Sequence, residues 1–448
     1  MAIPLNKKKR MKWMRIGVLS LFLIGIGLTR CGSTRPVNSL SQAFREKNLE
    51  SFDFVWSAIH AQHFDTTFGG ADWPAVREEL RPEMDRAESM REARAVLLEM
   101  IGRLNLSHFS IIPSELYQNL EMTDPAEDRS GDTGIDVFVN RESVWVQSIR
   151  PESPAEKADL RTGWEIVAVD DQSLKPLLLN LDREFGRKST KTLFMTREIT
   201  NRLTGPPGGS VRLKLVNLEE DTLTVRLSLE QKPGLEYQIG HLPPQFIQYE
   251  SRWLDESIGY IRFNNFLDPV RLMTAFNRDM LNFLKADGII IDIRGNGGGI
   301  VAMAMGMAGW FVSEKQQYLG TLHFRENEIK AVIFPRANSY HGPLAILVDE
   351  LSASTSEIFA GGLQDIERAV IVGSRTAGAT LPSTIVRLPN GDAFQYVLAN
   401  YVSRGGTVLE GRGVAPDLAV THTPESLASG TDRPLVKAVE IIRSSGKQ

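Results

Sequence analysis

Three serines stand close together in the stretch SASTSEIF, which runs from Ser352 to Phe359. It follows the apolar run LAILV and precedes the helix-like run EIFAGGLQDI, a junction where α/β folds commonly place chemistry. A serine at this junction could be a nucleophile, helped by the helix dipole and by the next backbone N–H as an oxyanion donor. Ser354, Ser356 and Glu357 equally have the composition of a helix N-cap and first turn. The pattern alone leaves both roles open.

A second candidate is the glycine-rich stretch IIIDIRGNGGG, which ends at Gly299. Its glycines allow backbone N–H groups to approach a substrate closely. It is not a dinucleotide-binding motif, because the third glycine of that motif would fall on Ile300, and no phosphate-binding Gly-Lys-Ser/Thr follows. The stretch therefore predicts either a tight turn or a nest of donors for a developing oxyanion.

Histidine has the side chain best suited to proton transfer near neutral pH, and His108 follows Ser107 in LNLSHFSII. A single histidine among apolar residues is also commonly a packed structural one. His60 and His63 lie three residues apart without a further ligand candidate nearby, so we interpret them as helix surface and core and predict no metal site.

The elements that must position these residues fall into several regions. A chain of 448 residues with 42% hydrophobic content is long enough for two or three domains. A net charge of −4 made of interspersed charges argues against nucleic acid as a partner. We predict a multidomain α/β protein with these parts: a signal segment (1–31), an N-terminal helical domain (32–130), a β domain (131–232), a linker (233–256), an α/β core (257–425) and a C-terminal helical tail (426–448).

The signal segment contains a basic cluster, an apolar run from Ile16 to Leu28 and the only cysteine, Cys31. The run has the length of a signal-peptide core, and a cysteine directly after it resembles the lipid-attachment site of bacterial lipoproteins, although Arg30 stands where that pattern has a small residue. The alternative is an uncleaved N-terminal anchor. Both readings predict an exported protein attached to a membrane, on the periplasmic or cell-surface side.

The β domain is predicted from short alternating runs such as GIDVFV, SVWVQSI and SVRLKLV around one short amphipathic helix in PESPAEKADLRTGW. This order, with the phrase SPAEKADLRTGWEIVAVDDQSL, resembles a PDZ domain. The resemblance implies a groove that binds an extended chain end as an added edge strand. A β-sandwich spacer is the alternative.

The combination of GIIIDIRGNGGG, the SxSxSE element, GLQD, VGxxTxG and GRGVAPD resembles the C-terminal (tail-specific) processing serine peptidases over about residues 52–420. The resemblance implies a crotonase/ClpP-like α/β peptidase core with Ser354 as the nucleophile. It implies an oxyanion hole from Gly297 or Gly298 together with the N–H of Thr355. Asp365, in GLQD, is implied to be a structural support.

The general base of the processing branch is a lysine in TFGKG, whereas this chain reads TAGAT with Ala379 at that position. A glutamine that assists the lysine in some members would fall near Ser383, so it is missing too. Arg375 is close in sequence, but its guanidinium stays protonated and cannot act as the base. The N-terminal region instead resembles the branch of the tricorn core protease and the interphotoreceptor retinoid-binding protein repeats. That resemblance implies which residue is the general base.

In the tricorn-type arrangement the histidine of a Ser-His pair is the base, and the serine and a glutamate complete a relay. The matching residues are His108, Ser107 and Glu410. We therefore predict an exported serine endopeptidase that acts on unfolded or extended protein segments and requires no cofactor. The alternatives are a catalytically inactive PDZ-containing lipoprotein that binds peptides, and a carrier of small apolar ligands.

Overall fold

The computed structural model describes residues 42–116, 130–140, 142–186 and 188–445. The predicted signal segment and Cys31 lie outside these residues. In the part of the chain that is described, no helix combines the length and the apolar character that crossing a membrane requires.

The N-terminal region contains three helices, α1 (Gln42–Gln62), α2 (Trp73–Asp85) and α3 (Met90–Gly102), with a short 3-10 turn at Phe68–Gly70. Two of them begin at side-chain caps, because Asp72 accepts the N–H of Ala75 and Ser89 accepts the N–H of Glu92. Their inward faces form one apolar cluster that includes the fully buried Trp73. The helical character predicted for this region is observed.

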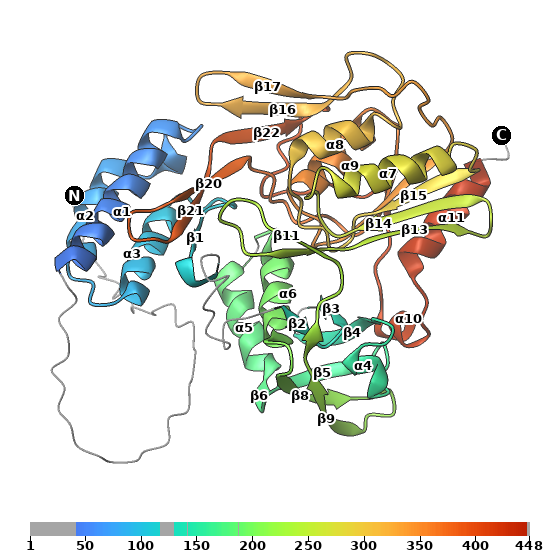
Figure 1. The fold of residues 1–448 in the computed structure, drawn as a ribbon, viewed down its shortest axis with the longest axis horizontal. Helices are drawn as coiled ribbons and strands as arrows, with labels where there is room; N and C mark the ends of the chain where they lie inside the picture. Colours follow the sequence, from blue (N-terminus) through green and yellow to red (C-terminus); the bar gives the residue numbers. More distant parts are fainter. Residues whose placement is uncertain (1–41, 117–129, 141, 187, 446–448) are drawn as a thin grey trace, which may run out of the picture.

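These helices do not form a separate unit, since their apolar cluster also contains Phe394 and Tyr396 of the core. The strand that follows them, β1 (Ser110–Ile112), pairs antiparallel with β21 (Ala393–Val397), which pairs in turn with β20 (Ser383–Arg387). Strand β1 lies beside β21 (Figure 1). The Ser107–His108 pair directly precedes β1, so this pairing holds it against the core.

The β domain has a six-stranded sheet in which five strands follow the order β3-β4-β5-β8-β9 and β6 pairs with β5. Strand β3 is an edge of this sheet. Only four residues of the predicted amphipathic helix are helical, and two longer helices that were not predicted follow it. Helix α6 packs along β3. The elements are β2 (Gly131–Asp132), β3 (Ile135–Asn140), β4 (Ser143–Ile149), α4 (Pro154–Lys157), β5 (Glu165–Val169), β6 (Gln172–Ser173), α5 (Leu174–Phe185), α6 (Lys191–Arg202), β7 (Thr204–Gly205), β8 (Ser210–Val216), β9 (Thr222–Ser228) and β10 (Glu230–Gln231).

The core is built on a six-stranded sheet in the order β13-β14-β15-β18-β19-β23. Its last five strands are parallel, as predicted, and β13 is an antiparallel edge. The predicted linker, residues 233–256, is more ordered than a linker, because it contains β11 (Leu235–Tyr237), β12 (Gln245–Ile247) and the core strand β13 (Tyr249–Leu254). The other strands are β14 (Ile258–Phe263), β15 (Gly288–Asp292), β18 (Leu344–Val348), β19 (Val370–Gly373) and β23 (Leu418–Ala419).

Both faces of this sheet are covered (Figure 1). Ile289 and Ile291 face one apolar cluster with α7 (Arg271–Asn282), α8 (Val301–Ala308) and α9 (Thr355–Asp365), whereas Ile290 faces another with α11 (Arg433–Ser445). The predicted C-terminal tail, which contains most of α10 (Pro424–Ala428) and all of α11, therefore supplies a layer of the core. The strands β16 (Tyr318–Phe324), β17 (Glu328–Val332) and β22 (Ala399–Ser403) form a separate sheet.

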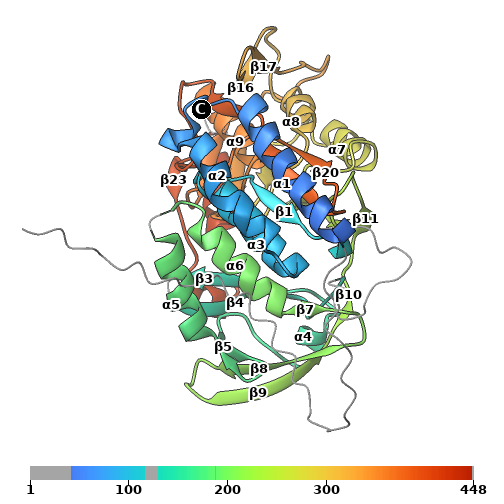
Figure 2. The same cartoon turned by 90° about the vertical axis from the view of Figure 1, so that its left-hand side faces the viewer.

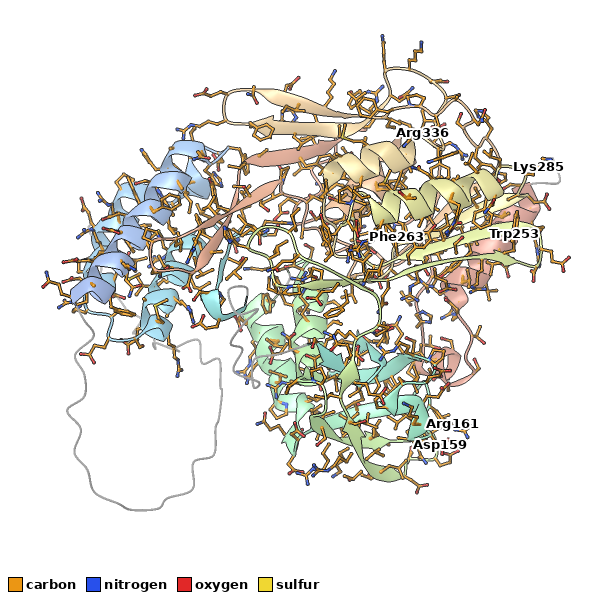
Figure 3. The ribbon with its side chains drawn as sticks, viewed as in Figure 1. Asp159, Arg161, Trp253, Phe263, Lys285 and Arg336 are labelled. Carbon is orange, nitrogen blue, oxygen red and sulfur yellow. The ribbon has the colours of Figure 1, made fainter. Side chains whose placement is uncertain are left out.

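Aromatic side chains fill the centre of the first cluster. Phe263 is 1% exposed and stacks edge-on against Phe266, whereas Trp253 on the outer strand β13 is 42% exposed (Figure 3). These aromatic side chains pack against α7 and α9, the helix that the serine stretch begins.

A buried ion pair joins the helical region to the core. Arg94 on α3 donates from Nε and Nη2 to the carboxylate of Asp392, at 2.9 and 2.8 Å. The Asp392 side chain is fully buried and also accepts the N–H of Ser114. This bidentate geometry fixes the helices relative to the β20–β21 hairpin.

We expect Arg94→Met to lower the free energy of unfolding by about 3 kcal/mol, because the Asp392 carboxylate stays buried without its cation. Urea unfolding followed by circular dichroism measures this loss. The matched control is Arg81→Met, which removes an exposed partner of Asp53 and should change stability by about 1 kcal/mol or less. Equal losses in the two variants would contradict the structural importance of the buried pair.

Candidate active site

The three serines of the SASTSEIF stretch differ in their surroundings. Ser352 is buried and donates to the carbonyl of Ile293, at 2.8 Å. Ser356 is also buried and donates to the side-chain and backbone oxygens of Asn296, both at 2.9 Å. Ser354 is partly exposed and lies between them at the N-terminus of α9. It is the serine of the three that a substrate can reach.

Ser354 has φ of 57° and ψ of −120°, a backbone conformation that non-glycine residues rarely adopt. Strain of this kind is concentrated at functional sites, and a sharp strand-to-helix turn presents a serine hydroxyl outward. The α9 helix dipole favours negative charge at the same place.

The glycine-rich turn packs directly against this serine. A Cβ on Gly298 would lie 2.7 Å from the Cβ of Ser354 and 2.8 Å from the N of Thr355, so only glycine fits. The N–H of Gly298 donates to Oδ1 of Asn296, at 2.9 Å. Among the described residues, the N–H groups of Gly297 and Thr355 have no such acceptor, which leaves these two free to hold an oxyanion.

Three of the other predicted residues form one hydrogen-bonded chain. Ser107 Oγ lies 2.7 Å from His108 Nδ1 and 2.9 Å from Glu410 Oε2. The Ser107 N–H donates to Glu410 Oε1, also at 2.9 Å. Residues that lie 303 positions apart in the sequence thus meet at one point.

Ser354 and His108 share no hydrogen bond in the described part of the chain, but one peptide group connects their surroundings. The Ser354 N–H donates to the carbonyl of Ala379, at 2.8 Å, and the next N–H, of Thr380, donates to Glu410 Oε2, at 2.9 Å. Hydrogen bonds between nucleophile and base commonly tighten only in the substrate complex.

Burial shifts the ionisation of this group of residues toward the neutral forms. It lowers the pKa of His108 to about 4, and the nearby positive charge of Arg197 lowers that pKa further. Burial also raises the pKa of Glu410, against the lowering by the donors of Ser107 and Thr380. His108 is therefore unprotonated near neutral pH, as a general base must be.

The position of the missing lysine is filled by apolar atoms. Ala379 is 5% exposed and clusters with Ala353, Ala377 and Leu193, the last of which comes from α6 of the β domain. An ammonium group at this position would have to be buried among these apolar side chains. The surroundings of residue 379 in this chain suit the alanine.

The remaining predicted residues lie away from this centre. Asp365, at the C-terminal end of α9, accepts the N–H of Gly405, at 2.6 Å. His60 is exposed and His63 is buried, as interpreted from the helical pattern. Among the described residues no group of three or more His, Cys, Asp or Glu side chains could hold a metal ion.

Three residues near Ser354 were not predicted as part of the site. Asn296 joins the glycine-rich turn to α9, and Glu357 accepts the Ser354 N–H, at 3.0 Å. Arg197 on α6 lies 3.7 Å from the position of a Cβ on Gly297. The acid that ends the SxSxSE element was a visible signal for Glu357, whereas nothing in the sequence pointed to Arg197.

A cleft of about 1160 Å³ lies between the β domain and the core. Its walls include Val137 of the edge strand β3, Thr196 of α6, and Arg262 and Leu351 of the core. In Figures 1 and 2, α6 lies on the side of the β domain that faces the helical region and the core. The cleft is large enough for an extended peptide and ends close to the serine stretch.

Comparisons with known proteins agree with this architecture. Residues 257–420 match the model of peptidase family S41, and residues 44–102 match that of the tricorn protease C1 domain. The carboxyl-terminal-processing protease of Synechocystis sp. is 27% identical over 383 residues, which cover 84% of this chain and 82% of that protein.

Two solved structures share the fold. The photosystem II D1 C-terminal processing protease has a TM-score of 0.56 at 22% identity, over 89% of this chain and 97% of that one. The tricorn protease has a TM-score of 0.51 at 18% identity, over 90% of this chain and 37% of that one. The predicted resemblance to the C-terminal processing peptidases and to the tricorn protease is confirmed, whereas the resemblance of the β domain to a PDZ domain stays a prediction.

We expect Gly298→Ala to slow labelling of Ser354 by a fluorophosphonate by about 10²-fold, because the new methyl group displaces the nucleophile. The glycine has φ of +93°, so the substitution also strains the turn. Gly102→Ala is the control, since a Cβ there meets nothing within 4 Å. Labelling at the wild-type rate in Gly298→Ala would show that this close packing is unimportant.

Removing the charge of Arg197 should raise the pKa of His108. In Arg197→Met, burial still keeps that pKa below its ordinary value, but the repulsion from the guanidinium is gone. NMR titration of ¹³C-labelled histidines, with His108→Gln to assign the resonance, measures the change. We expect titration near pH 4 in the wild type and at a higher pH in the variant; an unchanged pKa would mean that Arg197 exerts no charge effect on the base.

Proposed function

We propose that this chain, a serine peptidase whose residues 257–420 match the model of peptidase family S41, cleaves extended protein segments near their C-termini through an acyl-enzyme on Ser354. The observation that carries the proposal is the hydrogen-bonded chain from His108 through Ser107 to Glu410 beside this serine. It supplies a base where the processing branch has a lysine.

Counting protons shows which group donates and which accepts in the hydrogen bonds that link His108, Ser107 and Glu410. An ionised Glu410 only accepts, so the single hydroxyl proton of Ser107 is donated to it. Ser107 Oγ then accepts the Nδ1–H of His108, and Nε2 keeps its lone pair. Ser107 and Glu410 thus fix the tautomer that a base requires.

In acylation, Ser354 Oγ attacks the carbonyl carbon of the scissile bond while His108 Nε2 takes its proton. The carbonyl oxygen becomes an oxyanion that the N–H groups of Gly297 and Thr355 can hold. The C–N bond then breaks, the leaving amine takes the proton from Nε2, and the acyl-enzyme remains. Glu410 balances the transient imidazolium charge through Ser107.

In deacylation a water molecule attacks the ester carbon and gives its proton to Nε2. The C–O bond to Ser354 breaks, and the proton returns to the serine oxygen. The same donors hold the second oxyanion. The cycle uses only groups of this chain and water.

The β domain and the cleft support an extended polypeptide as substrate. Strand β3 is the edge strand of its sheet, where an extended chain can add by backbone hydrogen bonds, and α6 packs beside it; both features support the proposed PDZ-like groove. Folded segments cannot offer a free strand of this kind, so the proposal favours unfolded regions and chain ends.

We further propose that the protein is exported and held at a membrane. The support is the basic cluster, the apolar run Ile16 to Leu28 and Cys31, which precede the described residues. The peptidase would then act on proteins outside the cytoplasm.

Ser354→Ala and His108→Ala should each reduce cleavage of a denatured, C-terminally tagged protein by about 10³-fold or more, with the fold retained by circular dichroism. Ser107→Ala should give an intermediate loss, because it breaks the relay but keeps the base. The control is a second Ser-His pair, Ser339→Ala and His341→Ala, whose side chains lie 3.4 Å apart on the loop between β17 and β18.

Full activity in His108→Ala would refute the histidine base even if Ser354 proved essential. A wild-type protein that binds C-terminal peptides without cleaving them would favour the alternative of an inactive peptide-binding protein.

A further inference from the structure

Glu357 is the most completely enclosed carboxylate at the site. Its residue is 0% exposed, in the first turn of α9 and three positions after Ser354. A carboxylate so buried is costly unless donors surround it. The mechanism proposed above gives it no role.

Four donors point at this carboxylate and use both of its oxygens. Oε1 accepts Thr376 Oγ1–H at 2.6 Å and Gly378 N–H at 2.7 Å. Oε2 accepts Ala379 N–H at 2.9 Å and Ser354 N–H at 3.0 Å. Only the ionised group accepts from all four.

These donors come from two segments that carry different parts of the site. The first segment contains Ser354, the proposed nucleophile, in its strained backbone conformation. The second, from Thr376 to Ala379, leads into Thr380, whose N–H donates to Glu410. Glu357 therefore joins the backbone of the nucleophile to the backbone that holds the relay acid. Such a junction sets the distance between nucleophile and base.

We propose that Glu357 is a positioning residue for the reaction, a carboxylate clamp that fixes Ser354 relative to the Glu410–Ser107–His108 relay. The inference rests on the proposed role of Ser354 as nucleophile. It assigns no proton transfer to Glu357, which touches neither substrate nor reacting atoms.

Glu357→Gln tests the clamp with almost no change in volume. The amide NH₂ group faces donors, so two of the four hydrogen bonds are lost. We expect kcat per active site, counted by fluorophosphonate titration, to fall by about 10²-fold, and KM to change by about 3-fold or less. A purely structural role would lower the number of titratable sites and leave the rate per site unchanged.

A second pair of variants covers the case in which Glu357→Gln does not fold. Thr376→Ser keeps the hydroxyl donor, and Thr376→Val removes it at similar volume. We expect Thr376→Ser to work like the wild type and Thr376→Val to lose about 10-fold in kcat. Equal rates in the two variants would overturn the proposal.

The control is Asp279→Asn, because this buried carboxylate on α7 accepts a hydroxyl from Tyr249, at 2.9 Å, away from the site. It should leave kcat per site unchanged. Wild-type kcat in Glu357→Gln would overturn the proposal.

Hydrogen exchange distinguishes a failure of the Glu357 clamp from a failure of the proposed peptidase function. In Glu357→Gln we expect the amides of Ser354, Gly378 and Ala379 to exchange at least about 10-fold faster. Suppose that the wild-type protein shows no peptidase activity and that these amides nevertheless lose protection in Glu357→Gln. The proposed peptidase mechanism is then wrong, and the clamp is still supported. Unchanged protection would overturn the clamp whatever the activity.

Discussion

The site depends on one peptide group, the one that joins Ala379 to Thr380. Its carbonyl accepts the N–H of Ser354, and its N–H donates to Glu410, so the nucleophile and the relay acid bind opposite edges of the same rigid plane. A planar unit of fixed dimensions transmits position without a flexible side chain. The other contacts of the site keep this plane in place.

That geometry explains why the base can come from so far away in sequence. Glu410 holds the backbone and the hydroxyl of Ser107, and His108 follows directly. The pairing of β1 with β21 and the ion pair of Arg94 with Asp392 bring this segment to the core. A helical region that looks peripheral is in this way part of the catalytic apparatus proposed here. The apolar surroundings of Ala379 match the absence of a lysine.

The sequence was informative where chemistry leaves a local pattern. The multidomain α/β class, the parallel strands and the peptidase family could be predicted, because continuous apolar strands and the SxSxSE element are short-range signals. Strand β13 was missed, since YESRWL is an edge strand with only partial burial and reads as a connector. The helices α5 and α6 were missed because they pack against one side of a β domain identified by its strands. The reach of Arg197 toward Gly297 depends on how two domains pack, which no local pattern encodes.

Burial makes the site effective at a cost in stability. The same low-polarity surroundings lower the pKa of His108 and raise that of Glu357, to about 4 and about 7. For Glu357 the folded protein binds its proton more tightly than the unfolded chain does. Stability is therefore lost as pH rises from the ordinary carboxyl range through about 7, where the clamp becomes ionised. The charged form that accepts four donors is thus the form whose burial costs free energy, and the dense packing of the core and helices around it has to offset that cost.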